Sequence, residues 1–205
     1  MRTGIVLAGG RSTRFDGDKL LASIDGGSLL DSAVGAVADV ADEVIVAGRE
    51  IAASSPAIRG IADAEPFGGP LVALRGALRE ARGTSAVVVG GDMPDLVPEV
   101  LRLLLDRLDA DESIEAVILG RADPSSTAPD RPRPVLPIAL DVRAAAAASE
   151  AAISDGRRSL QSLLERMTWA ELPPSAWLPL DPHARTLLDV DTRADLERIK
   201  AAKGR

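Results

Sequence analysis

Residues 3–19 read TGIVLAGGRSTRFDGDK, in which a short apolar run leads directly into two glycines and then into clustered positive charge. A continuous apolar run of this length is typical of a strand buried on both faces, as in a parallel sheet. Because glycine has no side chain, the backbone N–H groups of Gly9 and Gly10 can approach phosphate oxygens closely. Positive charge around them comes from Arg11, Arg14 and Lys19. The stretch therefore predicts a buried strand followed by a phosphate-binding loop.

Two common nucleotide-binding motifs do not fit this stretch. Lys19 is followed by Leu20, and the glycine spacing is not that of a Walker A loop. The G-x-G-x-x-G pattern of dinucleotide-binding proteins is also missing. A plain glycine turn flanked by solvated charges is the structural alternative to a phosphate site.

Composition and charge restrict the class of protein. With 205 residues, 46% of them apolar, the chain is long enough to bury one substantial core, and we expect a single domain over residues 1–205. A net charge of −7 with scattered Lys and Arg argues against nucleic-acid or membrane-surface partners. The chain has no cysteine, which excludes a thiol nucleophile and thiolate metal ligands. Its first apolar run is too short for a signal peptide or a membrane span, so we expect a soluble, cytoplasmic protein.

Short apolar runs alternate with longer helical patterns along the chain. The expected strands are Thr3–Ala8, Glu43–Ala47, Ile58–Ala62, Ser85–Gly90, Glu115–Leu119, Val135–Ala139 and Arg185–Val190. The expected helices are Ser28–Val40, Pro70–Ala81, Val97–Leu108, Asp141–Ile153, Ser159–Met167 and Arg193–Lys203. This order predicts a doubly wound, mostly parallel α/β sheet, a Rossmann-like arrangement with helices on both faces. Residues 121–134, RADPSSTAPDRPRP, interrupt the alternation and indicate a long proline-rich loop, of a kind that is often functional.

Aspartates follow the expected strands Ser85–Gly90 and Arg185–Val190, at the edge of the sheet where ligands bind in folds of this type. In GGDMPDL at 90–96, we expect Asp92 to bind Mg²⁺, because this ion prefers carboxylate and phosphate oxygens. In DVDT at 189–192, Thr192 and Asp195 three residues later fit a helix N-cap pattern. Asp191 is then a candidate second carboxylate on the same metal, although aspartates near helix starts are also common without one.

The loop ADAEPFGGPL at 62–71 offers another ligand contact. Pro70 suits the first position of a helix, and Gly69 before it opens the backbone to a ligand. Asp63 is a candidate acceptor of hydrogen bonds from a base or a ribose.

Elsewhere in the chain, Trp169 and Trp177 are expected to be packing anchors rather than a platform for base stacking.

Five motifs taken together resemble the molybdenum cofactor guanylyltransferase family, part of a larger group of nucleotidyltransferases with a doubly wound fold. They are LAGGRSTRFDGDK at 7–19, FGGPLVAL at 67–74, GGDMPDL at 90–96, GRRSLQSLLE at 156–165 and DVDTRADL at 189–196. The resemblance implies transfer of GMP from GTP to the phosphate of molybdopterin, with Mg²⁺ and release of pyrophosphate. It also implies contact with enzymes that receive the cofactor.

The same resemblance implies roles for individual residues. Asp63 is expected near the guanosine and Asp92 on the metal. Nucleotide contacts are expected from Leu7, Ala8, Gly9, Gly10 and Lys19. Because a phosphate acceptor is already ionised at neutral pH, catalysis needs positioning and charge neutralisation more than a general base. The expected catalytic residues are accordingly Arg14, Lys19 and Asp92.

Two segments depart from the family pattern. Gly48 stands where the family often has an asparagine, and DRPRPVLP at 130–137 replaces the pattern D-G-R-x-x-P-L on the acceptor side. A same-fold nucleotidyltransferase that uses CTP or another nucleotide with a different phosphate acceptor therefore stays open. A non-catalytic nucleotide-binding relative is a third interpretation. The joint presence of Arg14, Lys19, Asp92 and Asp191 favours an enzyme. A protein that binds a nucleotide without turnover need not keep both the positive side chains and the metal-binding carboxylates.

Overall fold

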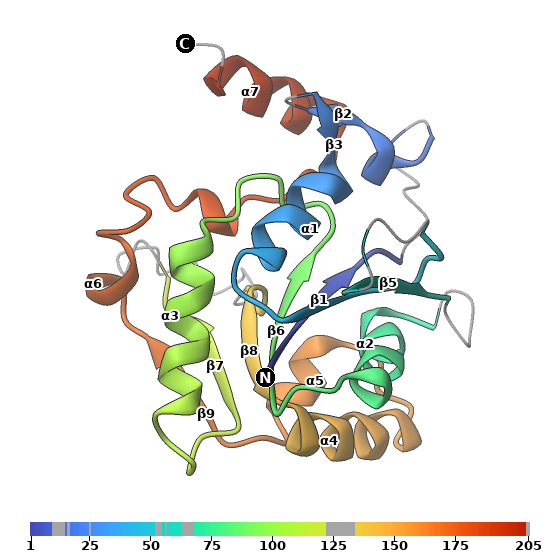
Figure 1. The fold of residues 1–205 in the computed structure, drawn as a ribbon, viewed down its shortest axis with the longest axis vertical. Helices are drawn as coiled ribbons and strands as arrows, with labels where there is room; N and C mark the ends of the chain where they lie inside the picture. The colour runs from blue at the N-terminus through green and yellow to red at the C-terminus, as the bar shows by residue number, and fades with distance from the viewer. Residues whose placement is uncertain are drawn as a thin grey trace.

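The computed structural model of the chain describes residues 1–9, 15, 17–24, 26–51, 55, 57–62, 68–121 and 134–203. Its seven-stranded sheet has the order β5-β4-β1-β6-β8-β7-β9 (Figure 1). The strands are β1 (Arg2–Leu7), β4 (Glu43–Ala47), β5 (Ile58–Ile61), β6 (Ser85–Gly90), β7 (Ala116–Leu119), β8 (Ile138–Asp141) and β9 (Trp169–Leu172). Strand β8 runs antiparallel to β6 and β7, and every other pair in this sheet is parallel. The predicted mostly parallel α/β fold is confirmed.

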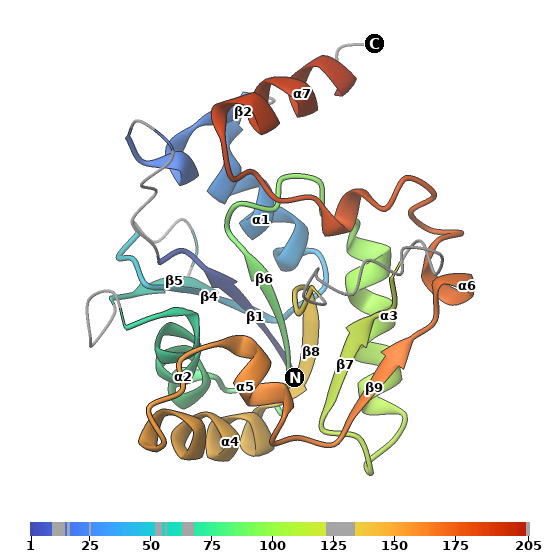
Figure 2. The ribbon, with the colours of Figure 1, turned by 180° about the vertical axis from the view of Figure 1, so that it is seen from behind.

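Helices cover both faces of the sheet, as Figures 1 and 2 show from opposite sides. Helices α1 (Leu29–Ala38) and α3 (Pro98–Asp109) pack on one face. Helices α2 (Pro70–Glu80), α4 (Val142–Ser154) and α5 (Leu160–Leu164) pack on the other. Because successive side chains of a strand point to opposite faces, Val87 belongs to the first apolar cluster and its neighbour Val88 to the second. The continuous apolar run of β6 is therefore buried throughout.

A third, smaller apolar cluster joins the C-terminal segment to the chain that follows β1. Helix α7 (Arg193–Lys203) lies beside the two-residue strands β2 (Ser23–Ile24) and β3 (Gly27–Ser28) at one end of the molecule (Figures 1 and 2). The cluster consists of Phe15, Ile24, Leu29, Val190, Leu196 and Ile199. Phe15 lies within the predicted phosphate-binding stretch, so α7 packs against at least this residue of it.

The predicted strand Arg185–Val190 is wrong. The segment instead forms a short 3₁₀ helix, η2 (Arg185–Leu187). The buried Asp181 carboxylate accepts a 2.7 Å hydrogen bond from Thr186 N, which folds the chain back into a turn. The N–H of Val190 then donates to Asp92 O at 2.9 Å instead of joining a ladder.

Two further differences concern the strands near the end of the sheet. Strand β8 begins at Ile138 rather than at Val135, because Pro137 has no N–H to donate to a ladder. The predicted helix Ser159–Met167 ends at Leu164, and the chain then forms β9, an edge strand that the sequence reasoning missed.

The two tryptophans differ in their environment. Trp177, in the short helix α6 (Pro174–Trp177), is fully buried and confirms the predicted packing anchor. Trp169 is 41% exposed, so the same prediction is wrong for it.

The other short element is η1 (Lys19–Leu21), which follows the glycine-rich stretch. Within the described part of the chain, no helix is both long and apolar enough to cross a membrane.

Candidate active site

The ends of three adjacent strands meet at one edge of the sheet. After β1, the N–H of Ala8 donates to Ala47 O at the end of β4, at 2.8 Å. After β6, the N–H of Gly91 donates to Leu7 O at 2.9 Å. These bonds hold the predicted nucleotide residues Leu7 and Ala8, and Gly9 after them, next to the segment that carries Asp92.

Lys19 is the centre of the site. Its ammonium Nζ lies 2.7 Å from Asp92 Oδ2 and 3.5 Å from Asp191 Oδ1. It also donates a 3.1 Å hydrogen bond to Val190 O. The side chains of Lys19 and Asp92 are 18% and 26% exposed, whereas Asp191 is 59% exposed. Asp92 and Asp191, predicted from separate motifs, thus lie with the Val190 carbonyl around the Lys19 ammonium.

Glycines make room for the Asp92 carboxylate. A Cβ atom on Gly90 would lie 2.4 Å from Asp92 Oδ1, and one on Gly91 would lie 3.2 Å from Leu7 O. The first distance is far inside van der Waals contact, so with a side chain at position 90 the Asp92 carboxylate would have to leave the position it occupies here. Gly90 thus favours this placement of the carboxylate, and Gly91 allows close approach to the end of β1.

Charge around the site shifts the pKa values of its groups. Burial alone would lower the pKa of Lys19, but the hydrogen bond and charge of Asp92, together with the charge of Asp191, raise it above its ordinary value. Asp189 also lies in this cluster: partial burial raises its pKa, and the negative charges of Asp191 and Asp92 raise it further. Sequence reasoning left Asp189 without a role, although its spacing of two from Asp191 was a usable signal.

The donor groups of the site make a weak site for a divalent metal by themselves, which a phosphate-bearing ligand would complete. Among the residues that the structure describes, no three His, Cys, Asp or Glu side chains converge to form a ready metal cage. Asp92 and Asp191, however, both face the single cation position that Lys19 Nζ holds. Mg²⁺ is commonly bound by one or two carboxylates together with phosphate oxygens and water. Two carboxylates beside Lys19, the last residue of the predicted phosphate-binding stretch, match that pattern.

Gly48 lies against Gly9, one of the residues predicted to contact the nucleotide. Its φ is +94°, and a Cβ atom there would lie 2.8 Å from both Cα and N of Gly9. A side chain such as the asparagine of the family pattern does not fit this backbone, so the departure has a structural reason. Next to it, Arg49 forms an ion pair with Asp18, the residue before Lys19. The loop after β4 is thus fastened to the predicted phosphate-binding stretch.

The start of α2 follows the sequence expectation. Gly69 is the N-cap residue with φ +94°, and Pro70 occupies the first helical position. A Cβ atom on Gly69 would lie 3.2 Å from Arg158 O, and Arg158 Nη1 donates to Gly68 O at 3.2 Å. The motifs at 67–74 and 156–165 are therefore packed against each other.

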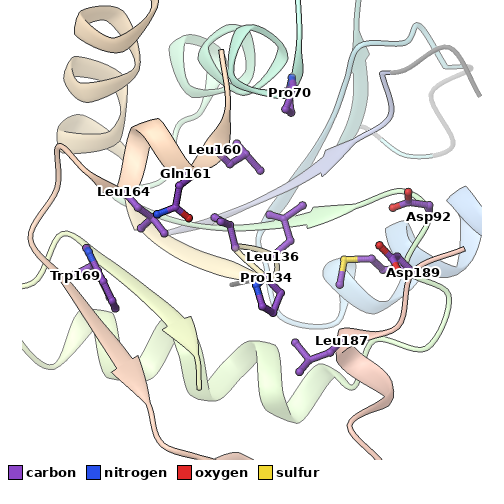
Figure 3. Close-up of a pocket in the computed structure, with 12 residues that line it drawn as sticks. Pro70, Asp92, Pro134, Leu136, Leu160, Gln161, Leu164, Trp169, Leu187 and Asp189 are labelled. Atoms are coloured by element: carbon purple, nitrogen blue, oxygen red, sulfur yellow. The ribbon is translucent and has the colours of Figure 1, made fainter. Parts of the chain in front are cut away.

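A pocket of about 790 Å³ extends from these carboxylates across the sheet. Figure 3 shows Asp92 and Asp189 at one end and Trp169 at the other. Gln161 contributes an amide to the wall. The remaining walls are largely apolar and are formed by Pro70, Met93, Pro134, Val135, Leu136, Leu160, Leu164 and Leu187. The pocket thus combines a charged end with a long apolar body and one exposed aromatic side chain.

Other predicted site residues lie outside the described part of the chain. They are Gly10, Arg11, Arg14 and Asp63, together with most of the proline-rich loop at 121–134. Their roles remain predictions.

The predicted helix cap at α7 is confirmed, since Thr192 N and Oγ1 donate to Asp195 Oδ2 at 2.8 and 2.7 Å, and Asp195 N donates back to Thr192 Oγ1 at 3.2 Å.

Comparisons with known proteins agree with this geometry. Residues 4–172 match the family described as the MobA-like NTP transferase domain. The chain is 31% identical over 210 residues to a probable molybdenum cofactor guanylyltransferase of Chloroflexus aggregans, with 100% of this chain and 96% of that protein covered.

Solved structures show the same fold. Molybdopterin-guanine dinucleotide biosynthesis protein A of Archaeoglobus fulgidus matches with a TM-score of 0.79 and 23% identity, covering 100% of this chain and 99% of the other. A Mycobacterium tuberculosis protein solved in complex with manganese matches with a TM-score of 0.60 and 21% identity, covering 98% of both chains.

Fold and family together define a nucleotidyltransferase. The chain belongs to the MobA-like NTP transferase family, and the resemblance to molybdenum cofactor guanylyltransferases drawn from five motifs is confirmed.

Proposed function

We propose that this protein transfers GMP from GTP to the terminal phosphate of molybdopterin and releases pyrophosphate. The observation that carries the proposal is the 2.7 Å pair of Lys19 and Asp92. Lys19 ends the glycine-rich stretch that follows β1, and Asp92 lines the 790 Å³ pocket. A nucleotide bound on the loop and an acceptor bound in the pocket would bring their phosphates together at these two residues. The sequence relative from Chloroflexus aggregans, a probable guanylyltransferase, supports the same reaction.

The reaction is an in-line displacement at phosphorus. An oxygen of the acceptor phosphate attacks the α-phosphorus of GTP, and the bond from that phosphorus to the bridging oxygen of the β-phosphate breaks as pyrophosphate leaves. The attacking oxygen is already ionised at neutral pH, so no general base is required. Positive charge must instead offset the charge on the α-phosphate and on the leaving pyrophosphate.

The residues divide this work between them. Backbone N–H groups of Gly9 and Gly10 would hold the triphosphate, and Arg11, Arg14 and Lys19 would offset its charge. Gly69 at the start of α2 would present its backbone N–H to the nucleotide, and Asp63 would bind the guanosine. Asp92 and Asp191 would hold Mg²⁺, which supplies charge neutralisation on the triphosphate when bound.

The pocket suits a flat heterocyclic acceptor with a phosphate tail. Trp169 lines the far end with a partly exposed aromatic ring that could stack on the acceptor, and Gln161 offers an amide that can pair with the polar edge of a ring (Figure 3). The phosphate tail would reach the charged end at Asp92, near the α-phosphate. Contact with enzymes that receive the finished cofactor remains a prediction from the family.

A thermal-shift panel tests the nucleotide directly. The purified protein is heated with GTP, CTP or ATP, each with Mg²⁺, because a ligand that binds only the folded state raises the midpoint by mass action. We expect the largest shift with GTP. Equal shifts with all three nucleotides would remove the guanylyl assignment. Release of pyrophosphate on addition of molybdopterin then separates an enzyme from a non-catalytic nucleotide binder.

A further inference from the structure

The ammonium of Lys19 stands where two carboxylates and a carbonyl meet. Its Nζ is 2.7 Å from Asp92 Oδ2, 3.5 Å from Asp191 Oδ1 and 3.1 Å from Val190 O. These are three oxygen atoms around one cation. A divalent metal held by Asp92 and Asp191 would have to use the same region of space.

We propose that the ammonium of Lys19 occupies the metal position between Asp92 and Asp191 while the nucleotide site is empty. When the nucleotide binds, the ammonium moves to the triphosphate, and only then can the metal bind the two carboxylates. This inference rests on the proposed function and concerns the order in which that site is filled. Two cations a few ångströms apart repel strongly in a partly buried site, so ammonium and metal exclude each other. Metal alone should therefore bind weakly, and nucleotide should favour its binding.

The C-terminal segment fixes the position of the oxygen atoms that surround the Lys19 ammonium. Val190 N donates to Asp92 O at 2.9 Å, and the Val190 side chain is fully buried in the cluster with Phe15 and Leu196. The carbonyl of Val190 is thereby held at a constant position beside Asp92. All of these C-terminal residues lie beyond residue 172, the end of the match to the family domain.

Lys19 itself is well placed to move. Its side chain is a flexible four-carbon stem with a compact charge and three donors, and it is partly open to solvent. Lys19 is the first residue of η1 and follows the glycine-rich stretch that would bind the triphosphate. While paired, it also prevents the carboxylates of Asp92, Asp189 and Asp191 from presenting a bare negative cluster to an incoming anion.

The test measures metal binding without nucleotide. Mn²⁺ is titrated into each protein and its free fraction is followed by electron paramagnetic resonance. In Lys19→Met and Lys19→Gln, we expect Mn²⁺ to bind about tenfold more tightly than in the wild type, or better, because a competing charge has gone. Lys200→Met is the matched control: it removes one lysine charge from a surface pair with Glu197 on α7 and should leave the affinity at the wild-type value. Far-UV circular dichroism confirms that each variant is folded.

A double variant locates the metal. Lys19→Met combined with Asp92→Ala should lose the gain in Mn²⁺ affinity, since the principal carboxylate is missing. Equal Mn²⁺ affinity in the wild type and both Lys19 variants would overturn the inference. So would tight binding that persists in the double variant, or no measurable binding by any of the proteins. The thermal-shift panel with GTP is independent of these titrations: a GTP shift with equal Mn²⁺ affinities removes this inference and leaves the guanylyltransferase proposal standing.

Discussion

Lys19 Nζ donates a 2.7 Å hydrogen bond to Asp92 Oδ2 although the two residues are 73 positions apart in the chain. The contact joins the segment after β1 to the segment after β6, which are neighbouring parallel strands. It places a flexible positive charge from the end of the glycine-rich stretch beside a carboxylate that lines the 790 Å³ pocket.

Replacement of Asp92 by alanine should abolish most nucleotidyl transfer while leaving the protein folded. Loss of a group that stabilises charge in the transition state typically lowers the rate by about 10²- to 10³-fold. The measurement is pyrophosphate release under saturating GTP and acceptor. Asp106→Ala, which removes an exposed carboxylate paired with Arg2, serves as the control and should keep normal turnover. Wild-type rates of release from Asp92→Ala would remove the metal assignment.

Replacement of Gly48 by alanine should weaken nucleotide binding. Its φ of +94° disfavours any side chain, and the new Cβ would press on the Gly9 backbone at 2.8 Å. We expect a loss of about 1–3 kcal/mol in the free energy of unfolding and a higher KM for GTP. Gly35→Ala in α1 is the matched control: its Cβ would meet nothing within 4 Å, so alanine there should stabilise the helix by about 0.5–1 kcal/mol. A Gly48→Ala protein with unchanged KM for GTP would contradict the close contact between the two loops.

Replacement of Trp169 by alanine should affect the acceptor and not the nucleotide. Trp169 lines the far end of the pocket from Asp92 (Figure 3). Removing a stacking aromatic group is expected to raise the KM for the acceptor by about tenfold, equivalent to about 1.4 kcal/mol. Steady-state kinetics with each substrate varied in turn separate the two effects. An equal rise in the KM for GTP would show that the pocket does not belong to the acceptor.

The C-terminal helix should be needed for nucleotide binding. Leu196 packs with Phe15 and Val190 in the third apolar cluster, and the Phe15 ring also lies 5.6 Å from Arg193 Cζ. Leu196→Ala should cost about 2–4 kcal/mol of stability and raise the KM for GTP, since the segment between β1 and η1 loses its support. Leu180→Ala, at an exposed leucine, is the control for loss of a leucine side chain. Destabilisation with an unchanged KM would limit α7 to a purely structural role.

Stability should depend on pH through Glu43. This carboxylate is only 3% exposed; burial would raise its pKa, but hydrogen bonds from Arg82 N, Arg59 and Thr3 outweigh that effect and lower it. Because the folded-state pKa lies below the ordinary value of 4.5, Glu43 stabilises the fold above that pH and loses its contribution as the pH falls through the folded-state pKa.

Glu43→Gln should therefore lower the free energy of unfolding at pH 7 by about 1–3 kcal/mol. The difference from the wild type should shrink below pH 4.5, the ordinary value for this group. Urea denaturation at a series of pH values measures it. A constant difference across that range would mean that the ionised form of Glu43 is not the stabilising one.

Much of the architecture was accessible from local sequence patterns. Strand β6 is specified by its own apolar run, and the start of α2 by a glycine followed by a proline. Both elements form where the sequence predicts them. The reciprocal cap of Thr192 and Asp195 is equally local. Strand β9 was missed because an exposed edge strand has no continuous apolar run, and η2 because the Asp181 bond that turns the chain involves a buried carboxylate.

The sequence by itself determined the chemistry available at the strand ends: glycines for close backbone approach, lysine for charge and aspartate for a hard cation. Only the tertiary structure decided that Lys19, Asp92, Val190 and Asp191 share one cation position, because their contacts span three separate segments of the chain. It also decided that Gly48 must lack a side chain, since the obstacle is the backbone of Gly9 on a neighbouring strand end. Local patterns report what a residue can do, whereas the packing of distant segments decides which residues act together.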